Sequence, residues 1–244
     1  MRLFIDTGSV SEVQEIAAWG VLAGATTNPS LLAKEEGDPG AIICRICELV
    51  GGPVSAEVVS EDPAQMVAQG RALAALHEHV VVKVPFGAAG LQAARALANE
   101  QIAVNMTLVF SPNQALLAAE AGARYVSCFM GRLDDVSIDS AEVLGGIVSS
   151  LRPGSAWAPD SAQVLAASIR HPEHVVTAAR LGCDVATVPG KVLRQMLDHP
   201  LTAAGIERFN ADWRSRPEFA EWLEGLAPEA GQSAAAGDVV GASR

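Results

Sequence analysis

The stretch VVVKVP, residues 80–85, is where the fold can first be read from the chain. Its hydrophobic residues occupy both alternating faces, which is typical of a parallel strand covered by other elements on both sides. The segment GLQAARALANE follows at residues 90–100 and has the composition and periodicity of a helix. One buried strand followed by one helix predicts a βα unit of a parallel sheet.

The same strand and helix pattern recurs along the chain. Strands are expected at residues 2–6, 23–28, 54–59, 80–85, 103–110, 124–130, 164–169 and 184–189. Helices are expected between them, among them 39–50 and 140–151, and several start at a capping residue followed by proline, as at Asp62-Pro63. Eight such units predict an α/β protein with a single (β/α)₈ TIM barrel. The competing architecture, an open doubly wound sheet, usually carries a glycine-rich phosphate loop, and neither GxGxxG nor GxxxxGK[ST] occurs.

Further helical patterns follow the eighth unit. Residues 201–216 are expected to form a ninth helix with Ile206, Phe209 and Trp213 on one stripe. We therefore predict a barrel with a C-terminal helix over residues 1–216 and a tail over 217–244. The tail is expected to be partly helical and then disordered, because it ends in alanine, glycine and serine. A closed barrel has little internal use for the apolar stripe, so packing against another subunit is expected.

The composition limits the classes of partner. Of 244 residues, 28 are acidic and 17 are basic, so the formal net charge is −11, which disfavours nucleic acid and anionic membranes. No apolar run approaches the roughly 18 residues of a membrane span, and the N-terminus lacks the pattern of a secretory signal. A cytoplasmic protein is expected. Cys44 and Cys47 form a CxxC inside a helical pattern, where packing is favoured over a redox or metal role.

Lys83 is the unusual residue of the fourth strand. The chain has only two other lysines: Lys34 lies in the charged loop KEEGD, and Lys191 opens a helix. An ammonium in an apolar strand loses hydration, which favours the neutral amine, and a neutral amine attacks ketones. The alternative role, protection of an exposed edge strand, is disfavoured because a closed barrel has no edges.

Polar side chains recur near the carboxyl ends of the predicted strands, the face at which barrel active sites form. They are Asp6, Thr26, Thr27, Asn28, Glu57, Asn105, Thr107, Ser127, Ser168 and Arg170. Any one of them could be a satisfied interior or capping residue. Their grouping around one apolar-strand lysine nevertheless predicts an active site. The five histidines fall on none of these strands, so a metal centre is not expected.

Seven co-linear segments also resemble a known family. They are FIDTGSVSEV, GATTNPSLL, SAEVVS, VVVKVP, VNMTLVFSPNQALLAAEAGARYVSCFMGRLDD, LAASIRHPEHV and HPLTAAGIERFNADW. They span nearly the whole chain and resemble the small transaldolases, close relatives of fructose 6-phosphate aldolase. The resemblance implies a barrel enzyme that works through a lysine Schiff base, without a metal or an organic cofactor. The alanine-rich tail lies outside it.

The resemblance also implies roles for individual residues. Lys83 falls on the Schiff-base lysine, and Asp6 falls on the carboxylate that takes the proton of the substrate's C4 hydroxyl. Glu57 and Thr107 fall on the pair that holds a catalytic water. The residues implied to hold the sugar hydroxyls are Thr26, Asn28, Asn105 and Ser127.

A phosphate site is implied at Arg132, Ser168 and Arg170. Two guanidiniums suit this role because each can bind two phosphate oxygens, which would attract an anionic sugar to an acidic protein. The arginines taken by themselves could equally form surface ion pairs, for example Arg132 with Asp134 or Asp135.

The implied reaction transfers a dihydroxyacetone unit from fructose 6-phosphate or sedoheptulose 7-phosphate to erythrose 4-phosphate or glyceraldehyde 3-phosphate. Aldolase members resemble one another in a tyrosine at the place of Phe129 and a glutamine at the place of Glu57, so this chain has the transaldolase pair. Cys128 stands where proline is frequent, which leaves the acceptor preference open. The alternatives are a fructose 6-phosphate aldolase, a specialised transaldolase with an acceptor such as ribose 5-phosphate, and a catalytically silent sugar-phosphate binding protein.

Assembly and cellular role follow from the same resemblance. Small members of the family generally form rings, often a decamer of two pentamers, so a homo-oligomer is implied. A role in carbohydrate metabolism, in the pentose phosphate pathway of the cytoplasm, is implied as well.

Overall fold

The computed structural model describes residues 1–152 and 162–226. The chain divides into two compact units, Met1–Leu197 and a second unit from Asp198 onward. The helix expected as the ninth is α11 (Pro200–Arg214), which lies in the second unit. The helical part of the tail is α12 (Pro217–Leu226). The disorder predicted for the rest of the tail concerns residues 227–244, outside the described residues.

The first unit is a closed barrel of eight parallel strands in chain order, in which β8 pairs with β1. The strands are β1 (Arg2–Asp6), β2 (Leu22–Thr26), β3 (Val54–Glu57), β4 (Val80–Pro85), β5 (Val104–Val109), β6 (Tyr125–Phe129), β7 (Gln163–Ala167) and β8 (Val185–Val188). This confirms the predicted TIM barrel. Each expected strand is present, and its ends differ by at most two residues from the expectation.

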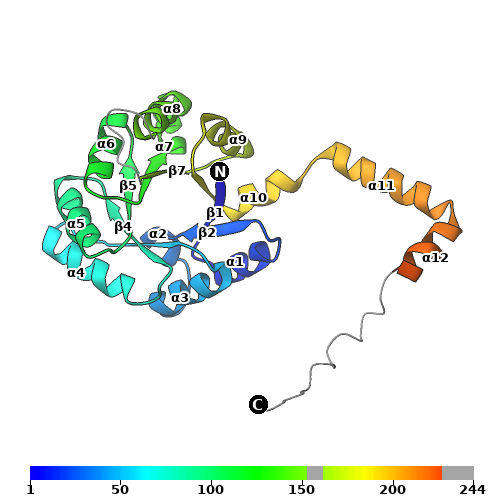
Figure 1. Ribbon diagram of the computed structural model, residues 1–244, viewed down its shortest axis with the longest axis horizontal. Coiled ribbons are helices and arrows are strands. Elements are labelled where there is room, and N and C mark those ends of the chain that lie inside the picture. Colours follow the sequence, from blue (N-terminus) through cyan, green and yellow to red (C-terminus); the bar gives the residue numbers. More distant parts are fainter. Residues whose placement is uncertain (153–161, 227–244) are drawn as a thin grey trace, which may run out of the picture. The chain divides into compact units, whose positions relative to one another are not determined.

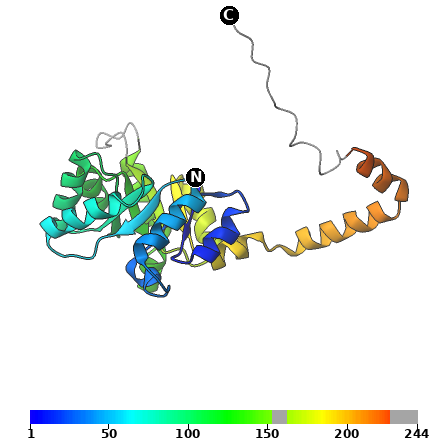
Figure 2. The same cartoon turned by 90° about the horizontal axis from the view of Figure 1, so that it is seen from below.

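Helices of the first unit surround the strands, as Figure 1 shows. They are α1 (Val10–Ala17), α2 (Pro29–Leu32), α3 (Pro39–Val50), α4 (Pro63–Ala74), α5 (Ala88–Asn99), α6 (Pro112–Glu120), α7 (Met130–Asp135), α8 (Ser140–Leu151), α9 (Pro172–Leu181) and α10 (Gly190–Leu197). In the second view, Figure 2, α11 is the long orange helix and α12 the red one that follows it. Within the described ranges, no helix is both long and apolar enough to cross a membrane.

Two short helices, α2 and α7, were not expected. The α2 helix exists because the Asn28 side chain accepts the backbone N–H of Leu31, and Pro29 provides a first residue already set for a helix. The α7 helix follows β6 directly, without a capping side chain. Both are too short for an apolar period to mark them in the sequence.

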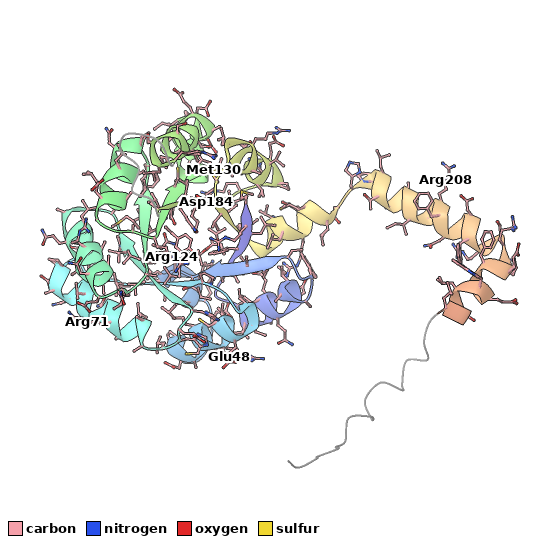
Figure 3. The ribbon with its side chains drawn as sticks, viewed as in Figure 1. Glu48, Arg71, Arg124, Met130, Asp184 and Arg208 are labelled. Carbon is pink, nitrogen blue, oxygen red and sulfur yellow. The ribbon has the colours of Figure 1, made fainter. Side chains whose placement is uncertain are left out.

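The larger core lies between the strands and the surrounding helices. Val80, Val82 and Val84 of β4 contribute to it, and α5 adds the fully buried Leu97. Gly70 of α4 faces Leu97 so closely that a Cβ there would lie 2.8 Å from a methyl group of the leucine. Charged residues lie on the outer helices, as Arg71 on α4 and Glu48 on α3 show in Figure 3.

A second apolar cluster is formed by the alternate strand residues. It contains Phe4, Val81, Tyr125, Leu165, Ala167 and Val185, from five strands. Residues two positions further along a strand lie on the same face, about 6.6 Å closer to its carboxyl end. Following this rule, Asp6 comes after Phe4, Lys83 after Val81, and Thr187 after Val185. The barrel interior is therefore apolar in the layer nearer the amino ends of the strands and polar in the layer at their carboxyl ends.

We expect Leu97→Ala to lower the free energy of unfolding by ~2–5 kcal/mol, because it empties fully buried volume between α4, α5 and β4. Thermal denaturation should show this as a drop in Tm of about 2–4 °C per kcal/mol. Leu117→Ala on α6 is the matched control, since that leucine is 53% exposed. Equal effects of the two substitutions would contradict the assigned core.

Candidate active site

A cavity of about 260 Å³ lies at the carboxyl ends of the strands. Ten of the sequence-predicted residues line it: Asp6, Thr26, Asn28, Lys83, Thr107, Ser127, Phe129, Arg132, Ser168 and Arg170. Of the other three, Glu57 reaches Lys83, Asn105 holds Ser127 through a hydrogen bond, and Thr27 accepts from Lys83 at its backbone carbonyl. Residues that come from β1 to β7 and the loops after them are thus gathered into one site.

Lys83 is 5% exposed and points into this cavity from β4. Its Nζ lies 2.9 Å from Oε2 of Glu57 and donates to the carbonyl oxygen of Thr27 at 2.6 Å. Glu57 is the direct partner of Lys83 in the register of β3 and β4, which brings the two side chains together. The sequence predicted a desolvated lysine, and the structure adds a buried carboxylate as its partner. The amine is therefore held between a carboxylate and a backbone carbonyl in the barrel interior.

Asp6 stands across the β1–β2 register from Thr26, whose hydroxyl donates to Oδ1 of Asp6 at 2.8 Å. Burial raises the pKa of Asp6 above its usual value, and the Thr26 hydrogen bond and the charge of Lys83 oppose that rise. The Thr26 hydroxyl also lies 2.6 Å from the hydroxyl of Thr187. Because the Thr26 hydrogen points to Asp6, Thr187 is the donor in this second contact. The carboxylate therefore ends a short hydrogen-bond chain.

Asn105 is fully buried and bridges two other polar residues. Its Oδ1 accepts from the hydroxyl of Ser127 at 2.6 Å, and its Nδ2 donates to the hydroxyl of Ser55 at 3.0 Å. Thr107 follows two positions later on β5 and is 1% exposed. These bonds fix the side-chain amide, so its orientation is set before any ligand enters.

Two of the predicted residues also have structural roles. Asn28 caps α2 while it lines the cavity. The Phe129 ring packs against Phe110, with ring centroids 5.8 Å apart, and the Arg132 guanidinium lies 5.2 Å from its centroid. A flat, apolar wall thus supports one of the two arginines.

The three predicted phosphate-binding residues lie at one side of the cavity. Ser168 has φ +56°, a left-handed conformation that non-glycine residues rarely adopt and that is often found at functional sites. Arg170 forms an ion pair with Asp135 at 2.7 Å, in which both side chains are more than half exposed. Sequence analysis considered Asp135 as a partner of Arg132. The structure pairs it with Arg170 because α7 and the loop after β7 are neighbours.

Two polar residues of the site escaped the sequence analysis. Thr187 lines the cavity, and Ser55 holds Asn105. Alternate residues of a strand share a face, and this could have pointed to Ser55, which precedes Glu57 by two positions. Thr187 lies in DVATVP, the eighth predicted strand. They were missed because a single threonine or serine in an apolar strand has no distinguishing signal.

Metal and thiol chemistry have little support in the described part of the chain. No group of three or more His, Cys, Asp or Glu side chains there is placed to hold a metal ion. All four cysteines are free. Burial raises the pKa of Cys47, Cys128 and Cys183 to about 12, so these thiols are poor nucleophiles at neutral pH.

The chain is similar to known proteins over most of its length. The family model described as "Transaldolase/Fructose-6-phosphate aldolase" matches residues 3–221. A "Probable transaldolase" of Moorella thermoacetica is 54% identical over 87% of this chain and 97% of its own length. Another from Thermus thermophilus is 52% identical over 87% of this chain and 98% of its own length. The chain therefore belongs to the transaldolase/fructose-6-phosphate aldolase family and is an enzyme.

A likeness among solved structures concerns the fold alone. A chain from a cube-shaped, highly porous protein cage, designed by fusing symmetric oligomeric domains, aligns with a TM-score of 0.57 at 14% identity. The alignment covers 93% of this chain and 82% of that one.

We expect Thr26→Val to raise the pKa of Asp6 further, because it removes a hydrogen bond that favours the carboxylate. Carboxyl ¹³C NMR across a pH titration measures this directly. Thr26→Ser keeps the hydroxyl and should leave the midpoint within a few tenths of the wild-type value. A Thr26→Val midpoint at or below wild type would refute the assigned hydrogen bond.

Proposed function

We propose that this enzyme is a transaldolase that moves a dihydroxyacetone unit from a ketose phosphate to an aldose phosphate through a Schiff base on Lys83. The observation that carries the proposal is the buried amine of Lys83, which lines one cavity together with the Asp6 carboxylate and two guanidiniums. An amine that attacks a ketone, a base and an anion site are the three parts that this chemistry needs.

The first step is imine formation. Glu57, 2.9 Å from Nζ, accepts the proton of the Lys83 ammonium, and the free amine adds to C2 of fructose 6-phosphate or sedoheptulose 7-phosphate. The resulting carbinolamine loses its hydroxyl as water. Glu57 returns a proton to that leaving hydroxyl through a water held with Thr107, and the iminium forms.

The second step is cleavage of the bond between C3 and C4. Asp6 takes the proton of the C4 hydroxyl, and the electron pair of the breaking bond moves into the iminium to give an enamine. The aldose phosphate leaves, as erythrose 4-phosphate or glyceraldehyde 3-phosphate. Burial raises the pKa of Asp6, which brings this carboxyl closer to the range in which it can both take and return a proton.

The remaining groups hold the substrate. Thr26, Asn28, Asn105 and Ser127 bind the hydroxyls of the three-carbon unit, and Arg132, Ser168 and Arg170 bind the phosphate of donor and acceptor. The exposed ion pair between Arg170 and Asp135 is weak enough for a phosphate to displace it. The second aldose phosphate then adds to the enamine, and hydrolysis of the new iminium frees Lys83.

Transfer is favoured over release of free dihydroxyacetone by two residues. Phe129 has no hydroxyl with which to protonate the enamine, and its ring is packed against Phe110 and Arg132. Glu57 adds a second likeness to transaldolases, because the aldolase members resemble one another in a glutamine at this place. The three-carbon unit therefore stays bound until an acceptor arrives.

A homo-oligomer that acts in cytoplasmic carbohydrate metabolism, in the pentose phosphate pathway, is part of the same proposal. The compartment and pathway are implied by the family, and the support for the oligomer is the set of large apolar side chains exposed in α11 and α12: Leu201, Ile206, Phe209, Trp213, Phe219, Trp222, Leu223 and Leu226. Such a set is unusual on a monomer surface and is typical of a surface that a second subunit covers.

We expect borohydride treatment in the presence of fructose 6-phosphate to leave a stable sugar adduct on the peptide that contains Lys83, because hydride reduces the iminium. Lys83→Ala should show no adduct and should lose at least about 10³-fold in turnover. Lys34→Ala, at an exposed loop lysine, is the control and should keep both. Mass spectrometry of the digested protein checks this. No adduct on the wild-type enzyme would favour a silent binding protein.

We expect fructose 6-phosphate to be consumed steadily only when an aldose phosphate acceptor is present. The measurement is turnover with erythrose 4-phosphate, with ribose 5-phosphate and with no acceptor. Acceptor-independent release of dihydroxyacetone would identify a fructose 6-phosphate aldolase. Preference for ribose 5-phosphate would identify a specialised transaldolase.

A further inference from the structure

The two arginines of the cavity come from different elements that are in direct contact. Arg132 lies on α7, and Arg170 lies in the loop between β7 and α9. The backbone N–H of Gly131 donates to the carbonyl oxygen of Ser168 at 3.0 Å. A Cβ at Gly131 would lie 2.3 Å from that oxygen and 2.5 Å from Nε of Arg170, so only glycine permits the approach.

His174 joins the same two elements by its side chain. Its Nε2 lies 2.9 Å from Oδ2 of Asp134 on α7, and its Nδ1 accepts the backbone N–H of Arg170 at 3.3 Å. Both bonds can exist only in the neutral imidazole that carries its hydrogen on Nε2. Asp134 is itself held, because its Oδ1 accepts the backbone N–H of Ser140.

The surroundings of His174 keep it neutral. The residue is 8% exposed, and its ring lies 3.9 Å from the ring of His171 between centroids. Burial, together with the neighbouring charges of His171 and Arg170, lowers the pKa of His174 below its usual value, and Asp134 only partly opposes this. The tautomer that makes both bonds is therefore the stable one at neutral pH.

The guanidinium of Arg170 is anchored much more weakly than its backbone. Its partner Asp135 is exposed, so a phosphate that binds the guanidinium takes the place of this carboxylate. When Asp135 is displaced, two hydrogen-bonded links between this segment and α7 remain: Gly131 with Ser168, and Arg170 through His174 to Asp134.

We propose that His174, together with Asp134, is a positioning residue for the phosphate site. It holds the backbone of Arg170 at a set distance from the helix that carries Arg132, and so determines the affinity for the phosphate end of the substrate. This inference rests on the proposed function in one respect: the ligand of the two arginines is a sugar phosphate. Its simplest competitor is a role in stability alone, because His174 is the third residue of α9 and reaches back to an N–H before the helix, as a capping residue does.

Three substitutions separate these roles. His174→Asn keeps an acceptor near the position of Nδ1, so it retains the bond to Arg170. His174→Gln keeps a donor near the position of Nε2, so it retains only the bond to Asp134. His174→Leu removes both. The matched control is Asp62→Ala. It removes the carboxylate that accepts the backbone N–H of Gln65 and so caps α4, and it leaves the cavity intact.

The readouts are the dissociation constant of inorganic phosphate, the KM for glyceraldehyde 3-phosphate, the KM for unphosphorylated glyceraldehyde, and the Tm. We expect His174→Leu and His174→Gln to raise the phosphate constant and the KM for glyceraldehyde 3-phosphate at least five-fold, with the KM for glyceraldehyde unchanged. His174→Asn keeps the bond to Arg170 but loses the one to Asp134, so it should raise both values less than His174→Leu does. Asp62→Ala should lower the Tm without changing either phosphate readout.

The proposal is overturned if His174→Leu lowers the Tm as Asp62→Ala does but binds phosphate as tightly as wild type. It is also overturned if the wild type binds no inorganic phosphate and does not discriminate between the two acceptors. A chain that binds phosphate with the expected dependence on His174, but transfers no three-carbon unit, would support the positioning role and refute the proposed function. The two ideas can therefore fail separately.

Discussion

The ion pair between Lys83 and Glu57 is the interaction on which the site depends. Both side chains are largely buried, and removing two charges from water costs several kcal/mol per ion unless each finds a partner. The register of β3 and β4 supplies that partner, and the carbonyl of Thr27 takes a second hydrogen of the ammonium. A lysine is thus kept inside an apolar barrel, and its proton has a place to go when a ketone arrives.

The barrel tolerates this polar layer because an apolar layer supports it from below. Phe4, Val81, Tyr125 and Val185 fill the interior two residues before the polar positions of their strands. Above them, Thr187, Thr26 and Asp6 form one chain of hydrogen bonds, and Ser127, Asn105 and Ser55 form another. Each polar side chain in these chains is oriented by its neighbours, so the cavity keeps its shape without a ligand. The same logic extends outward to His174, which orients a segment that itself carries a cavity residue.

Much of the fold was predictable because its signals are local. The strand VVVKVP begins and ends where the sequence placed it, and α3 and α8 have the expected bounds. The misses have physical reasons. The helices α2 and α7 are too short to show a helical repeat of apolar residues. His174 was set aside as a helix-associated residue, since a contact between α9 and α7 leaves no mark in a linear pattern.

By itself the sequence determined which residues form strands and helices and which polar residues lie at strand ends. It could do so because alternation, capping and hydropathy act over a few neighbouring positions. Lys83 was recognisable as an unusual residue for the same reason, since an isolated charge in an apolar strand is a local anomaly. Only the tertiary structure decided the partners: that Glu57 faces Lys83, that Thr187 ends the chain to Asp6, and that Asp135 pairs with Arg170 rather than with Arg132. These pairings depend on strand register and on the approach of distant loops, which closure of the barrel sets and no short stretch of sequence encodes.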